Sequence, residues 1–358
     1  MRDGYLASIG AAVLIAGIAV SVQVPVAGQS AQGTKSGVPA RSGYTLPKTA
    51  DGQPDLQGVW ANNNATPLER PKIFEGRALL TEQEVTALKK RAAELFGGDG
   101  DAAFGDSIYE AVLSDVKKYK PTEFDKETGN YNAFWIVERD FDNRTSLITD
   151  PPDGRMPPMV PLAEKRAADL LKATKEHPAD GPENRPPNER CITFGMPDLL
   201  AGYNSYYQIV QGPGYVAILS ERIHDVRIIS LDGRPHPPKS VRAWMGDSRG
   251  RWEGNTLVVD TTNFKPNSGH ILLRGAGSEE LHLVERFTRV GPKTINYEVT
   301  LEDPKTWTRP WTLMIPLKHT DDHVYEYACH EGNTAMTGIL SGYRAQEKAA
   351  QQTKTQQQ

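Results

Sequence analysis

The sequence predicts a mainly β protein with helical decorations, of the α+β class, built around an antiparallel up-and-down β-barrel. Two observations support this prediction. From Tyr206 onward, short runs of β-branched and aromatic residues alternate with Gly, Pro, Asp and Asn, which is typical of strands joined by turns. About eight or nine such runs follow one another at intervals of roughly 10 to 15 residues, without a helical crossover. A meander of that length usually closes into a barrel, because closure removes exposed edge strands.

The expected strands can be read in order along the second half of the chain. They are YQIVQ, YVAILSE, RIHDVRIISL, GRW, TLVVDTTNF, LHLVERFTRV, TINYEVTLE, WTLMIPL and HVYEYACHE. Hairpin turns are predicted at Gly212-Pro213-Gly214 and at Glu253-Gly254-Asn255. In TINYEVTLE every second residue from Ile295 to Leu301 is apolar, so one face of this strand is expected inside the barrel.

The N-terminal half contains three helical patterns. The first covers residues 80–96, where Thr81 is the expected N-cap and Glu84, three residues later, completes a capping box. The second spans about residues 108–118 and the third about residues 162–175, and each is followed by a proline that stops it.

The start of the chain has the layout of a secretory signal peptide. Arg2 precedes an uncharged, small-residue-rich run over 6–22 that is shorter than a membrane span, although an uncleaved anchor is the alternative. We therefore expect a periplasmic or secreted protein with no membrane span after signal cleavage. The expected organisation is a signal peptide (1–28), a disordered linker (29–50), an N-terminal strand with helical and loop decorations of the same domain (51–200), the antiparallel barrel (201–344) and a disordered tail (345–358).

Charge and cysteine content narrow the possible partners and compartment. The net charge is −4 with both signs interspersed, so no nucleic-acid partner is expected. An exported chain meets an oxidising compartment, and a disulfide between Cys191 and Cys329 is therefore predicted. Two unrelated buried thiols are the alternative.

Several longer motifs point to relatives. PDLQGVW (54–60), GDSRGRWEGNTLVVDTTNF (246–264) and YEYACHEGN (325–333) resemble an uncharacterised family of exported proteins from acidobacteria and related proteobacteria. This resemblance implies kinship and export but no particular activity. In addition, Gly58-Val59-Trp60 is similar to the opening motif of lipocalin-like barrels, in which the indole plugs the closed end; a core tryptophan is the alternative.

No established catalytic or cofactor motif is present, and no cofactor is expected. The remaining candidates for a functional site are charged residues within otherwise apolar strands. If the apolar strand faces line a lumen, charged residues on those faces converge inside it and must form ion pairs or a functional site. The residues concerned are Asp225, Arg227, Asp260, Glu285, Glu326 and His330.

The first functional hypothesis is a cofactor-independent enzyme, such as a hydrolase, lyase or isomerase, acting on a small organic molecule or saccharide. Asp225, Glu285 and His330 would perform general acid/base catalysis, and Arg227 would hold an anionic group. A structural network of buried ion pairs is the alternative for these residues.

A second group of candidates lies at the GDSRGRW stretch. Arg249, Arg251, Asp247 and Trp252 could bind substrate at a barrel mouth, or Asp247 and an arginine could fix a turn with Trp252 in the core.

A metal site is a weaker possibility, in which neighbouring His and acidic pairs on two strands supply the ligands. These weak candidates are His224, Asp225, His330 and Glu331.

Two further functions stay open. One is a lipocalin-like carrier of a hydrophobic or aromatic ligand, suggested by Gly58-x-Trp60 and the meander. The other is a structural or envelope-interaction protein, suggested only by the lack of motifs.

Overall fold

The computed structural model describes residues 44–96, 109, 112–113, 139–199, 201–266 and 277–356. The predicted signal peptide and most of the predicted linker lie outside these residues. So does the helix predicted at 108–118, apart from Tyr109, Val112 and Leu113, which are helical.

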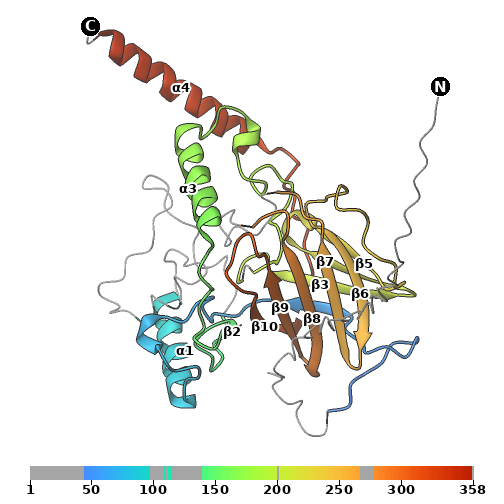
Figure 1. Cartoon of the computed structure of the whole chain (residues 1–358). Helices are drawn as coiled ribbons and strands as arrows, with labels where there is room; N and C mark the ends of the chain where they lie inside the picture. Colours follow the sequence, from blue (N-terminus) through green and yellow to red (C-terminus); the bar gives the residue numbers. More distant parts are fainter. Residues whose placement is uncertain are drawn as a thin grey trace, which may run out of the picture. The chain divides into compact units, whose positions relative to one another are not determined.

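Nine strands close into a barrel, as the sequence predicts (Figure 1). Hydrogen-bonded neighbours follow the order β1-β3-β4-β5-β6-β7-β8-β9-β10, and β1 also pairs with β10, which completes the ring. A tenth strand, β2, pairs with β10. The strands are β1 (Gly58–Ala61), β2 (Ile148–Asp150), β3 (Tyr206–Gly212), β4 (Tyr215–Ser220), β5 (Val226–Ser230), β6 (Asp247–Glu253), β7 (Thr256–Thr262), β8 (His282–Gly291), β9 (Thr294–Glu302) and β10 (Trp311–Thr320).

One pairing departs from the predicted antiparallel meander. Strands β5 and β6 run parallel and meet at Ser230 and Arg249, whereas the other neighbours in the ring are antiparallel. The segment 231–246 causes this difference, because it crosses from one end of the barrel to the other instead of forming a hairpin turn. The barrel is therefore mixed rather than purely antiparallel.

The short strand β1 closes the barrel between two strands that come much later in the chain. Trp60 lies opposite Tyr207 of β3 and His319 of β10. Its indole is fully buried and Nε1 donates a 2.8 Å hydrogen bond to the carbonyl of Leu56, while the guanidinium of Arg289 lies 5.3 Å from the ring centre. This placement is consistent with a lipocalin-like barrel in which the tryptophan fills one end.

The period-2 pattern of the strands places the core as predicted. On β9, Ile295, Tyr297, Val299 and Leu301 are buried in the barrel interior, while the intervening Glu298 and Thr300 are only partly buried. The same alternation holds on β5, where Arg227 and Ile229 are buried and the neighbouring Val226 and Ile228 are exposed.

Two predicted helices are confirmed. Helix α1 (Glu82–Phe96) begins with the expected capping box, because the amide of Glu84 donates to Oγ1 of Thr81 at 3.2 Å and the amide of Thr81 donates to Oε2 of Glu84 at 2.8 Å. Helix α3 (Pro161–Glu176) begins with a proline at its first position, where a missing amide proton costs nothing. The short 3-10 helices are η1 (Lys72–Phe74), η3 (Pro182–Asn184) and η4 (Arg222–His224).

The C-terminal region differs from the prediction in two ways. The run HVYEYACHE is not a strand, because β1 already occupies the free edge of β10. The barrel therefore ends at Thr320 rather than at residue 344. Helix α4 (Thr334–Gln356) covers most of the tail predicted to be disordered, and its Ala, Gln, Lys and Glu residues are good helix formers.

The predicted disulfide between Cys191 and Cys329 is present. It joins the loop after α3 to the segment that links β10 with α4. Within the described ranges, no helix has the length and hydrophobicity needed to cross a membrane.

Candidate functional site

A pocket opens at the end of the barrel where β3 begins and β4 ends. Tyr207 and Ser220 face each other across these two strands, and Arg227 stands one strand further on, opposite Ile218. The pocket is partly enclosed by the barrel and partly open to solvent. Its walls are mainly apolar and aromatic. The lining residues are Phe194, Gly195, Met196, Asp198, Tyr207, Ile209, Ile218, Ser220, Asp225, Arg227, Met245, Phe287, Tyr297 and Leu317.

The predicted residues Arg227 and Glu285 come together at this pocket as an ion pair inside the barrel. Nη1 and Nη2 of Arg227 donate to the two carboxylate oxygens of Glu285 at 2.6 and 3.0 Å. Glu285 also accepts hydrogen bonds from Tyr297 at 2.7 Å and Thr261 at 3.3 Å, and its side chain is fully buried. Burial and the nearby Glu285 charge raise the pKa of Tyr297, which keeps its phenol protonated as a donor. Because four donors occupy Glu285, its carboxylate fits the structural alternative better than the catalytic one.

A second ion pair lies beside the pocket, and no helix or strand period in the sequence predicts it. Arg222 donates to Asp198, and Ser220 Oγ donates to the other oxygen of Asp198 at 3.0 Å. The Arg222 side chain is 2% exposed, and its guanidinium lies 5.4 Å from the ring centre of Phe194. Asp198 lies in a loop, where no strand or helix period could mark it.

Asp225 is the predicted catalytic residue whose carboxylate lines the pocket and has no salt bridge among the described residues. Its carboxylate is partly buried and accepts a 2.8 Å hydrogen bond from Thr193 Oγ1. Burial raises its pKa, and the neighbouring Asp198 charge adds to this effect, while the Thr193 hydrogen bond works against it. Among the described residues, no Lys, Arg or His nitrogen lies within 4.0 Å of this carboxylate.

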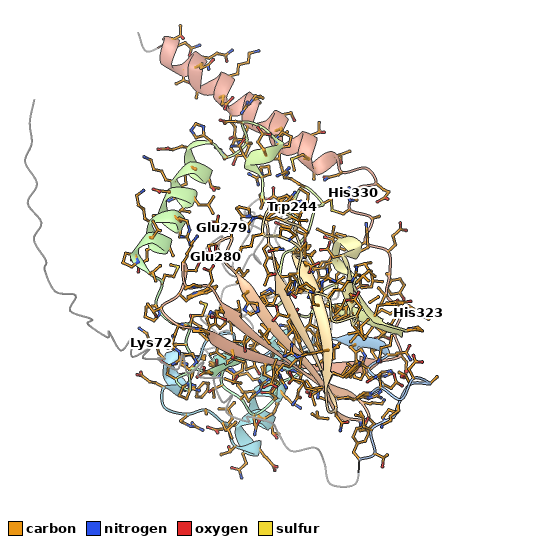
Figure 2. The ribbon with its side chains drawn as sticks, turned by 45° about the vertical axis from the view of Figure 1, so that its right-hand side comes forward. Lys72, Trp244, Glu279, Glu280, His323 and His330 are labelled. Carbon is orange, nitrogen blue, oxygen red and sulfur yellow. A yellow bond between two sulfur atoms is a disulfide. The ribbon has the colours of Figure 1, made fainter. Side chains whose placement is uncertain are left out.

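Of the three predicted catalytic residues, Asp225 lines the pocket, Glu285 is buried behind its Arg227 wall, and His330 lies elsewhere. It is exposed on the segment before α4, outside the strands (Figure 2), and its ring centre lies 5.9 Å from that of His224. The expected convergence is wrong for His330, and for the exposed Glu326, because this segment is not a strand.

The weak metal candidates do not assemble either. His224 and His330 lie side by side, but Glu331 is exposed, and the part of the chain that the structure describes holds no group of three or more His, Cys, Asp or Glu side chains suited to a metal ion.

The substrate-binding group predicted at the GDSRGRW stretch is divided between two faces of β6. Trp252 packs against the barrel core, whereas Asp247, Arg249 and Arg251 alternate with it and face outward. Arg249 Nε donates to Asp247 at 2.8 Å and Arg251 donates to Glu253 at 2.7 Å, so both arginines have acidic partners. This arrangement supports the alternative of surface ion pairs with a core tryptophan.

Asp260 also faces outward, contrary to the expectation that it lines the lumen, because Leu257, Val259 and Thr261 take the inward positions of β7. There it joins a network that the sequence did not reveal. His236 bonds to Asp247 at 2.7 Å and to Asp260 at 3.0 Å.

The network continues through His282, which bonds to Asp260 at 3.1 Å and to Glu302 at 3.3 Å. The hydrogen bond to Asp260 raises the pKa of His282, with a smaller contribution from Glu302 and opposition from burial. The network therefore favours a charged imidazole on the outer wall of the barrel.

The fold and site together define a closed β-barrel with a mainly apolar pocket at one end. No family model, no curated protein and no solved structure matches the chain. The functional argument therefore depends on the pocket itself.

Proposed function

We propose that this protein is an exported carrier that binds a small apolar or aromatic molecule in the end pocket of its barrel. The observation that supports this function is the pocket wall. Aromatic and aliphatic side chains such as Phe194, Ile218 and Phe287 form most of it, and a small number of polar groups can orient a ligand. Barrels of similar strand number hold small ligands in their interior.

The distribution of charged groups favours binding over the acid/base mechanism predicted first. That mechanism requires Asp225, Glu285 and His330 in one pocket. Glu285 is saturated by four donors and His330 is exposed outside the strands. A carrier needs only the apolar walls and a polar anchor, and both are present.

Filling the pocket tests this function. Ile218→Trp adds bulk to the pocket wall, whereas Ile228→Trp places the same side chain at a position of β5 that is 61% exposed and faces outward. We expect Ile218→Trp to weaken binding of N-phenyl-1-naphthylamine, an uncharged fluorescent probe, by about tenfold or more. Ile228→Trp should leave the affinity unchanged. Circular dichroism spectra like that of the wild type would verify that both variants fold.

A co-purifying small molecule, detected by native mass spectrometry of wild-type protein and lost in Ile218→Trp, would identify the natural ligand. Equal affinity of the wild type and both variants for the probe would contradict the carrier function.

Export is the second part of the proposal. The signal-peptide layout, the resemblance of several motifs to those of exported proteins and the Cys191–Cys329 disulfide support it. N-terminal sequencing of the protein recovered from the periplasm or the medium should give a mature start near Gln29. Recovery of uncleaved protein from the cytoplasm alone would contradict export.

Asp225 supports one competing function, general base catalysis on a molecule held in the same pocket. Burial raises the pKa of its carboxylate, which is the usual preparation of a carboxylate base. If the protein turns over a substrate, for example in a screen of aryl esters and glycosides, Asp225→Asn should lower kcat/KM by about 100-fold or more, and His330→Ala should have no effect. Equal turnover by wild type and Asp225→Asn would exclude this role.

A further inference from the structure

We propose that the pocket selects molecules that carry a positively charged group beside an apolar or aromatic body, with the cation placed against Asp225. This inference depends on the proposed carrier function and adds the chemical class of the ligand. It follows from the way charge is paired around the pocket and from the nature of the walls.

Of the three carboxylates considered around the pocket, two form ion pairs with arginines and one does not. Arg222 is paired with Asp198, and Arg227 is paired with Glu285. Asp225 lines the same pocket and accepts hydrogen bonds from the neutral hydroxyl of Thr193 and the backbone amide of Phe194, and among the described residues it forms no salt bridge with a basic side chain. These five ionisable groups therefore sum to one negative charge. In a partly enclosed pocket of low dielectric constant this charge acts more strongly on a ligand than it would in water.

A bound cation would offset an unfavourable feature of the pocket. Burial of the Asp225 carboxylate without a salt bridge is costly, although His224 interacts with it favourably from a distance, and an ammonium group beside it would supply both an opposite charge and hydrogen-bond donors. An anionic ligand would be repelled by Asp225, and the positive charge of Arg227 is already balanced by Glu285.

The aromatic walls suit the same class of ligand. Phe194, Tyr207, Phe287 and Tyr297 line the pocket, and the rings of Phe287 and Tyr297 are stacked with centres 4.6 Å apart. Ring faces attract cations as well as apolar groups. The guanidinium of Arg222 already uses the ring of Phe194 in this way.

Three probes of nearly equal shape and different charge test the inference: 1-naphthylmethylamine, 1-naphthylmethanol and 1-naphthoate. Titration calorimetry at neutral pH with the full mature protein should show the amine binding about tenfold more tightly than the alcohol, and the carboxylate binding most weakly. Asp225→Asn should reduce amine affinity to about that of the alcohol. Asp321→Asn is the control, because its carboxylate is 92% exposed and outside the pocket.

The outcomes separate the inference from the function that it extends. Equal affinity of the wild type for all three probes, or preference for the carboxylate, would overturn charge selection and leave the carrier function standing. Binding of none of the probes would overturn both. The comparison within the wild type needs no variant, and Asp225→Glu, which keeps the charge, should keep the preference for the amine.

Discussion

Arg227 and Glu285 place two full charges inside the barrel, at 7% and 0% side-chain exposure. Moving these charges out of water is costly, and the two hydrogen bonds between them, with those from Tyr297 and Thr261, offset that cost. Such a pair contributes little net stability, but loss of one partner leaves the other charge buried alone.

Glu285→Ala should therefore lower the free energy of unfolding by about 3–5 kcal/mol, as measured by urea denaturation. The double variant Arg227→Met with Glu285→Leu should be much closer to the wild type, because no uncompensated charge remains. Arg251→Ala breaks an exposed pair with Glu253 and should cost less than about 1 kcal/mol. A cost of Glu285→Ala as small as that of Arg251→Ala would contradict the buried-pair interpretation.

His282 gives a pH-dependent contribution to stability. Its pKa in the folded protein is raised above 6.5, mainly by the hydrogen bond to Asp260. Its stabilising contribution is therefore fully present below about pH 6.5 and is lost as the pH rises through the folded pKa. His282→Asn should lower the melting temperature at pH 5.5 and have a smaller effect at pH 9, with a loss of about 1 kcal/mol or less at the lower pH.

His323 provides the control for this measurement, because it lies exposed on the segment after β10 (Figure 2). His323→Asn should leave the pH profile of stability unchanged. An effect of His282→Asn that is equal at both pH values would show that its network acts through packing rather than through charge.

At the scale of elements, the capping box of α1 makes a local contribution that can be measured separately. Thr81→Ala removes the oxygen that accepts the Glu84 amide proton and should destabilise the protein by about 1 kcal/mol. Thr86→Ala is the matched control, because Thr86 is exposed within the same helix and alanine has the higher helix propensity. Thermal unfolding followed by circular dichroism measures both. Equal effects of the two substitutions would contradict a role for the cap.

Sequence reasoning succeeded where a local pattern determines structure. The alternation around Tyr297 placed the inner face of β9, and the Thr81–Glu84 spacing placed the start of α1. It also placed Asp225 and Arg227 beside the pocket, although Asp225 lies between η4 and β5 and the strand begins only at Val226. These predictions use periods of 2 and 3.6 residues, which the chain displays directly.

Sequence reasoning failed where the position of a residue depends on distant parts of the chain. The strand predicted around His330 has suitable residues but no free sheet edge, because β1 pairs with β10. The ion pair of Asp198 with Arg222 joins a loop to a 3-10 helix, and no local period relates the two. The apolar Val258 predicts the wrong face for Asp260, because Val258 points away from the barrel interior although it is buried.

At the scale of the whole molecule, the disulfide joins residues 138 positions apart. A loop of this length loses much of its freedom in the unfolded chain, so the double variant Cys191→Ala with Cys329→Ala should lower the free energy of unfolding by about 4–5 kcal/mol. Dithiothreitol should destabilise the wild type and have no effect on this variant. A wild-type urea midpoint that does not change with reductant would show that the bond contributes little.

The disulfide also lies near the pocket, because Phe194 follows Cys191 by three residues and lines its wall. The segment that carries Cys329 contacts the same end of the barrel, where the amide of Tyr325 donates to Glu221 and a ring nitrogen of His224 bonds to the carbonyl of Tyr327. The bond therefore fixes the position of one pocket wall as well as stabilising the fold.

The position of β1 between β3 and β10 has a consequence for synthesis. Trp60 is made early, and one of its two pairing partners, His319, is made some 259 residues later. Until translation reaches β10, the growing polypeptide keeps unsatisfied backbone amides and carbonyls along an incomplete ring. Contacts that are so distant along the chain form slowly, and nascent molecules are correspondingly vulnerable to self-association and dependent on chaperones during that interval.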